Sequence, residues 1–199
     1  MKSFANKAPL IGGIAYMFGS LLFLINKFNE MSRLWLGQFM PDVIDGNDVA
    51  VIVIGQVALV IGYVIYFRHF APRSGKAAQV GIALFCVGGI MVAVAHSIPE
   101  RIVPFIFALL AVGLIIMLFG LFWFGIVALR QPVLTRWRWL PLFTGVMGAL
   151  GFLIFSGPEI NARFLVFRTL FALGLFAMGL NLALEKSESS HEEQKKATA

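Results

Sequence analysis

Residues 97–105 read SIPERIVPF and residues 156–164 read SGPEINARF, and each stretch leads into a long apolar run. Placing residues 97–120 over residues 156–179 aligns Ser97 with Ser156, Pro99 with Pro158, Glu100 with Glu159, Phe105 with Phe164 and Gly120 with Gly179. A shift of 58 residues back along the chain places Pro99 on Pro41, Glu100 on Asp42, Gly113 on Gly55 and Gly120 on Gly62. This internal period predicts three helical hairpins of one design, all inserted in the same direction.

The proline and the acid of each copy have two interpretations. Proline lacks a backbone donor and suits a turn or the first position of a helix. A neighbouring carboxylate faces the partial positive charge at the start of the outgoing helix. The phrase is then a turn and a cap. In the other interpretation, Asp42, Glu100 and Glu159 converge on a site at the outer surface.

The composition indicates an all-α integral membrane protein. The chain of 199 residues is 59% hydrophobic and 13% charged, and its mean hydropathy is +0.87. A soluble domain has roughly half apolar and a quarter charged residues, so this chain has too few charges to cover a water-facing surface. The formal charge of +6 lies in short stretches between apolar runs, which is the pattern of membrane topology. No nucleic-acid partner is expected.

Crossing a hydrocarbon core of about 30 Å takes about 20 apolar residues of helix. The stretches that meet this length are 8–26, 49–67, 77–98, 102–129, 139–157 and 164–184. They predict a six-transmembrane-helix bundle in a single domain, residues 1–184. Residues 185–199, EKSESSHEEQKKATA, mix acids and bases with almost no apolar residues and predict a disordered cytoplasmic tail. A segment that docks on a partner is the alternative for this tail.

The lysine and arginine residues predict which way the chain faces. They are concentrated before the first span and in the connections after the second and fourth spans, at Lys2, Lys7, Arg68, Arg73, Lys76, Arg130, Arg136 and Arg138. Because basic connections stay on the cytoplasmic side, both termini are expected in the cytoplasm. We expect the protein in the plasma (inner) membrane, as a multi-pass chain.

Arg168 is the charge that falls most clearly inside a predicted span. Ionisable groups within a membrane are expensive and are functional candidates by default. Its guanidinium either snorkels to the outer interface or forms a bidentate pair with Asp42, Glu100 or Glu159. Arg168 is therefore the first candidate for ligand binding.

His96 ends the third span, just before the first Pro–Glu turn. Beside Glu100 and Glu159 it would be an acid–base group or a metal ligand. A lone histidine at such an interface otherwise caps its helix through a local hydrogen bond. The sequence contains no paired intramembrane histidines, no HExxH and no GxSxG, so neither a metal nor another cofactor is expected.

Gln56 and Asn181 are amides inside predicted spans. Such side chains hydrogen-bond to neighbouring helices or, less often, line a path for a ligand.

The leading functional hypothesis is a non-catalytic structural or accessory membrane protein, in contact with the bilayer and with a second copy or a partner subunit. The first alternative is a transporter of small molecules or lipids, which would use Gln56, Asn181, Arg168 and Asp42 for binding. The second alternative is an outer-leaflet enzyme acting on a lipid headgroup with His96, Glu100 and Glu159.

Overall fold

The computed structural model describes residues 2–36, 49–98, 105–156 and 162–197, and the side chains of residues 7–25, 50–98, 105–156 and 162–185. Asp42, Glu100 and Glu159 lie outside the described residues. The predicted convergence of these three carboxylates, and their pairing with Arg168, remain predictions for that reason.

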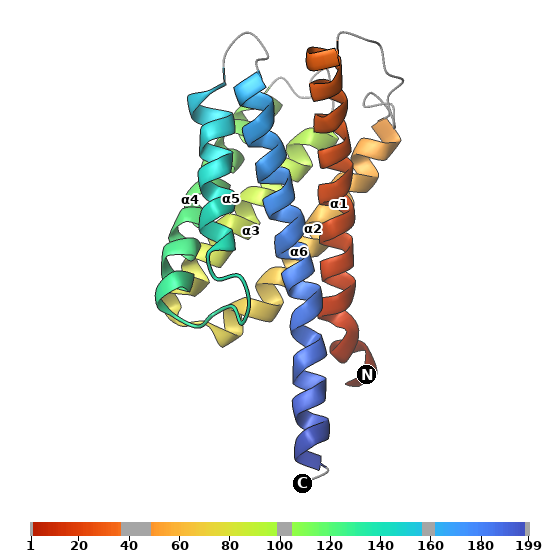
Figure 1. Cartoon of the computed structure of the whole chain (residues 1–199), viewed down its shortest axis with the longest axis vertical. Helices are drawn as coiled ribbons and strands as arrows, with labels where there is room; N and C mark the ends of the chain where they lie inside the picture. Colours follow the sequence, from red (N-terminus) through yellow and green to blue (C-terminus); the bar gives the residue numbers. More distant parts are fainter. Residues whose placement is uncertain (1, 37–48, 99–104, 157–161, 198–199) are drawn as a thin grey trace.

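The described residues are mostly helical and contain no strand. The elements are α1 (Lys2–Leu36), α2 (Val49–Phe70), the 3₁₀ turn η1 (Ala71–Arg73), α3 (Lys76–Ser97), α4 (Ile106–Arg130), α5 (Leu140–Ala149), the π-helical turn η2 (Leu150–Ile154) and α6 (Ala162–Ala197). Each long helix packs against the next one in the chain, and α6 returns to pack against α1. The helices therefore form a closed ring, with both termini at the same end (Figure 1). We call this the termini end and the opposite one the far end.

In the described part of the chain, five helices are long and apolar enough to cross a membrane, which agrees with the predicted all-α membrane protein. The segments that could span it are Lys7–Ile25, Ala50–Arg73, Lys76–Ser97, Ile106–Arg130 and Ala162–Glu185. The predicted span 139–157 forms a shorter apolar helix, Leu140–Ile154, which is about 22 Å long. A sixth full span therefore stays a prediction.

Three helix boundaries differ from the predicted ones. The first helix continues to Leu36 instead of ending near residue 26, and the fourth begins at Ile106 instead of residue 102. The last helix continues to Ala197, through the stretch predicted as a disordered tail. Glutamate, lysine, glutamine and alanine there are good helix formers, and this propensity acts on the backbone without any apolar face to bury.

Glycine residues let the helices of the ring approach backbone to backbone. A Cβ atom on Gly88 of α3 would overlap the backbone of Met117, and one on Gly120 of α4 would overlap the backbone of Phe85. Glycines of both helices therefore allow the backbones of α3 and α4 to come into direct contact. Without a hydrophobic driving force between helices in lipid, such close approach supplies much of the packing energy.

The glycines that matched in the proposed repeat do not all meet equivalent partners. Gly62 of α2 packs against Tyr16 of α1, and Gly120 packs against the helix that precedes its own. Gly179 of α6 instead packs against Gly13 and Met17 of α1, where the ring closes. The three-hairpin repeat stays a prediction from sequence.

Aromatic side chains fill the interior of the ring on the side of the termini end. The rings of Tyr16 and Tyr63 have centroids 5.0 Å apart, and those of Tyr63 and Phe85 are 5.3 Å apart. Tyr66 and Phe124 continue this buried cluster. The interior is thus solid here, and open space begins beyond Tyr63 toward the far end.

Candidate functional site: a cavity toward the far end

A cavity with a volume of about 600 Å³ lies inside the ring, lined by residues of α1, α2, α3, α4, η2 and α6. Its lining includes Tyr63 and Met117, whose hydroxyl and Sδ atoms are 3.8 Å apart, and His96 and Ser156, which lie at the far end. Between them the walls are largely leucine, isoleucine, valine and phenylalanine. An apolar space of this size with a few polar groups is typical of a site for a small organic molecule.

Arg168 contributes the positive charge of the cavity lining. Its guanidinium carbon lies 4.1 Å from the centroid of the Phe152 ring and 3.9 Å from that of Phe164. Cation–π attraction to both rings holds the guanidinium in place. Arg168 stands six residues after the start of α6 at Ala162, about 9 Å along the helix. The charge that the sequence singled out is therefore part of the cavity.

The π-helical turn makes room for this arginine. A Cβ atom on Gly151 would lie 3.1 Å from Cγ of Arg168, so the side chain crosses the turn where a glycine leaves space. π-Helical turns inside α-helices occur frequently at functional sites. The distortion of the fifth helix and the position of Arg168 thus belong to the same local structure.

His96 also lines the cavity, and it makes the local bond that the sequence allowed as its alternative role. Its Nδ1 lies 3.0 Å from the carbonyl oxygen of Val92, one turn earlier in α3. Because a carbonyl only accepts, Nδ1 carries the proton of that bond. His96 is thereby oriented by its own helix.

The two predicted amides occupy different parts of the molecule. Gln56 of α2 lines the cavity, together with His96 and Arg168. Asn181 is buried in α6 toward the termini end, where its Nδ2 donates to the carbonyl oxygen of Arg136 at 3.0 Å. Asn181 is not part of the cavity lining. It links a helix to the connection between α4 and α5.

Replacing Asn181 with leucine is expected to lower the free energy of unfolding by about 1 kcal/mol, because the Arg136 carbonyl loses its donor. For a chain of this size that is a decrease in Tm of about 2–4 °C. Thermal unfolding of the purified protein measures it. A Tm equal to that of the wild type would show that this bond does not hold the connection.

A second polar cluster at the termini end was missed by sequence reasoning. Glu185 accepts hydrogen bonds from the backbone nitrogen and the Oγ1 of Thr135, both at 3.2 Å. Its Oε2 lies 3.4 Å from Nε2 of His69, which in turn lies 3.1 Å from Nη1 of Arg73. The side chains of His69 and Glu185 are only 9% and 8% exposed. Glu185 is too far in sequence from Thr135 and His69 for any local pattern to have joined them.

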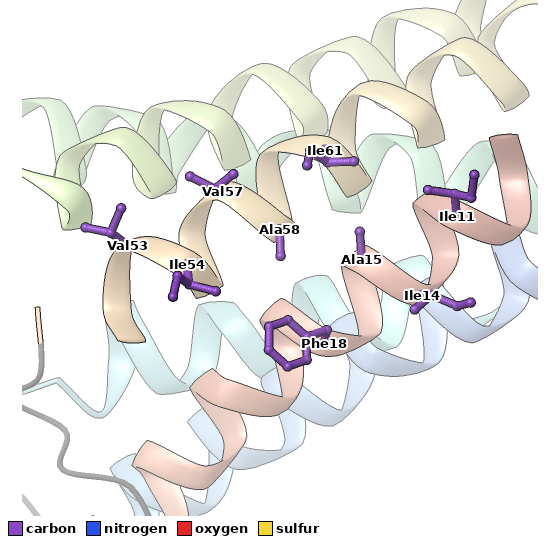
Figure 2. A pocket seen from close by; sticks show the side chains of 9 residues that line it. All are labelled: Ile11, Ile14, Ala15, Phe18, Val53, Ile54, Val57, Ala58 and Ile61. Atoms are coloured by element: carbon purple, nitrogen blue, oxygen red, sulfur yellow. The ribbon is translucent and has the colours of Figure 1, made fainter. Parts of the chain in front are cut away.

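A separate groove lies on the surface between α1 and α2, shown in Figure 2. In this view Ala15 of α1 and Ala58 of α2 point toward one another across it. Its lining consists of Ile11, Ile14, Ala15, Phe18, Val53, Ile54, Val57, Ala58 and Ile61. Because all nine side chains are apolar, the groove offers contact for hydrocarbon but no group that would orient a ligand.

Among the described residues, no three histidine, cysteine, aspartate or glutamate side chains lie close enough together to bind a metal ion. The cavity is therefore described by its apolar walls and by the polar groups of Arg168, His96 and Gln56. Comparisons with protein-family models, with curated proteins and with solved structures found no match to this chain.

Proposed function

We propose that this chain is a lipid-handling protein of the plasma membrane that binds one amphipathic, anionic molecule in its cavity. The observation that carries the proposal is the position of Arg168 in the wall of an otherwise largely apolar space. Both termini are assigned to the cytoplasm, because the connections at the termini end contain Arg73, Arg136 and Arg138. The cavity then lies in the outer half of the membrane.

The guanidinium selects the head of the ligand. Arginine presents five N–H donors in a planar fork, which matches carboxylate and phosphate oxygens. With five donors it can hold an acid of this chain and a ligand oxygen at the same time. The rings of Phe152 and Phe164 keep the fork in place. Charge-assisted hydrogen bonds are roughly twice as strong as those between neutral groups.

The remaining walls select the body of the ligand. Leu114 and Leu175, from facing helices, line the cavity with other aliphatic and aromatic side chains. Polar molecules without an apolar part would leave these walls without contacts. A hydrocarbon chain gains free energy from them in proportion to the area it covers.

A purely structural role, the leading hypothesis from the sequence, has less support than this one. Glycines let the helices pack closely around the aromatic core, whereas the half of the ring toward the far end contains the cavity. A scaffold gains nothing from a cavity, since each missing contact reduces stability. The enzyme alternative has His96 and Arg168 in its favour, but its carboxylates lie outside the described residues.

Native mass spectrometry of the protein, extracted from vesicles of phosphatidylglycerol and phosphatidylcholine, tests this function. The wild type should retain the anionic lipid in preference to the zwitterionic one. Arg168→Gln should reduce retention roughly tenfold or more, because charge-assisted bonds contribute about 1.5–3 kcal/mol. Arg163→Gln is the matched control: it removes an exposed positive charge from the same helix, outside the cavity.

Arg168→Lys separates ligand loss from misfolding. It keeps the charge but removes the planar fork, so retention should fall between those of the wild type and Arg168→Gln. Gel filtration of each variant reports on folding. Equal retention by folded wild type and folded Arg168→Gln would contradict the proposal.

A further inference from the structure

The fifth helix is held against α4 only in the half of the ring toward the termini end. Gly125 of α4 packs against Leu142, and Gly145 of α5 packs against Leu121. Toward the far end, the last of these close contacts is between Gly148 of α5 and Leu118 of α4. Beyond it the chain enters the π-helical turn η2, which packs against α6. The wall between α4 and η2 therefore lacks a close glycine contact in the far half of the ring.

Three residues mark an opening in this wall. Phe107 and Ile115 of α4 and Leu153 of η2 all line the cavity, yet they are 67%, 57% and 56% exposed. A side chain that lines an internal space while most of its surface is accessible stands at the edge of an opening. Because two of the three belong to α4 and one to η2, the opening lies between these elements.

The opening faces hydrocarbon. Ile115 stands nine residues after the first residue of the spanning segment Ile106–Arg130, about 14 Å along the helix. That depth falls within a hydrocarbon core of about 30 Å. The three side chains at the edge are apolar, as lipid contact requires. A molecule passing between them comes from the surrounding leaflet and not from water.

We propose that the gap between α4 and η2 is a lateral entrance through which a hydrocarbon chain of an anionic phospholipid enters the cavity from the outer leaflet. The headgroup then stays at the level of Arg168, beside Phe152 of η2. The charge of Arg168 and the apolar edge together fit a molecule with an acidic head and an apolar chain. This inference rests on the proposed function and adds the source of the ligand and its route.

Tryptophan substitutions at the edge test the route. Leu153→Trp and Ile115→Trp place a bulky side chain in the opening. The matched controls are Ile154→Trp and Val112→Trp, since both positions are exposed on the same elements but do not line the cavity. Protein in phosphatidylglycerol vesicles is mixed with an excess of vesicles of deuterated phosphatidylglycerol and a lipid-transfer agent, and the bound lipid is followed by native mass spectrometry over time.

We expect both edge variants to slow replacement of the bound lipid roughly tenfold or more, which corresponds to about 1.4 kcal/mol in a barrier. Equilibrium retention should stay near that of the wild type, and both control variants should exchange at the wild-type rate. Edge variants that retain the lipid and exchange it at the wild-type rate would overturn the lateral entrance and leave the proposed function standing. Two results would overturn both the lateral entrance and the proposed function. In the first, the wild type retains no phosphatidylglycerol. In the second, it retains inorganic phosphate as well as it retains phosphatidylglycerol.

Discussion

Replacing Gly120 with alanine is expected to lower the free energy of unfolding by about 3 kcal/mol, the upper part of the range for overpacked interiors. The added methyl group would overlap the backbone nitrogen of Phe85, and a backbone cannot rotate away as a side chain can. The helices α3 and α4 would have to move apart where their backbones are in direct contact. For a chain of this length the corresponding decrease in Tm is roughly 6–12 °C.

Gly55→Ala is the matched control. Its added methyl group would meet Cδ1 of Leu22 at 3.1 Å, which is the far end of a flexible side chain. Alanine also favours helix over glycine by about 0.5–1 kcal/mol, so this variant should melt at or above the wild-type temperature. Thermal unfolding in one detergent compares the two substitutions. Similar melting of both variants would show that the α3–α4 approach does not limit stability.

The second large effect is expected at the termini end, where Glu185→Ala should lower the free energy of unfolding by about 3 kcal/mol. The side chain of Glu185 is almost fully enclosed and accepts two hydrogen bonds, and hydrogen bonds to a charged group contribute about 1.5–3 kcal/mol each. The substitution removes Oε1, the one oxygen that accepts from both the backbone nitrogen and the Oγ1 of Thr135. The connection from residue 131 to residue 139 should then exchange its amide hydrogens faster, while the α3–α4 contact keeps its protection.

Glu185→Gln separates the charge from the hydrogen bonds. Glutamine keeps a carbonyl oxygen that Thr135 can reach, but it loses the negative charge that lies 3.4 Å from Nε2 of His69. Its stability should lie between those of the wild type and Glu185→Ala.

The connection between α4 and α5 also contains Trp137 in a left-handed conformation, with φ at 49°. A bulky residue adopts this conformation only when its surroundings hold it there. Unchanged hydrogen exchange in Glu185→Ala would contradict this role.

The candidate site was predicted in part. Arg168 was identified because a charge inside an apolar run is costly, and His96 because it ends a span beside a turn. The transporter hypothesis grouped Arg168 with Gln56, but no sequence pattern placed His96 with Gln56, because the three residues lie on different helices, far apart in the chain. Gln56 and Asn181 looked alike in sequence, yet one lines the cavity and the other bonds to the carbonyl of Arg136.

Apolar runs and their lengths determined, from sequence alone, that the chain is helical and membrane-embedded. Lipid leaves the backbone no partner outside its own helix, so run length translates directly into helices. Only the tertiary structure decided which helices pack against one another. Gly62, Gly120 and Gly179 occupy matching positions in the proposed repeat, but Gly62 and Gly120 pack against the preceding helix, whereas Gly179 packs against the first helix of the chain and closes the ring. A glycine marks where a helix can be approached closely, and only the packed bundle decides which helix approaches and where space remains.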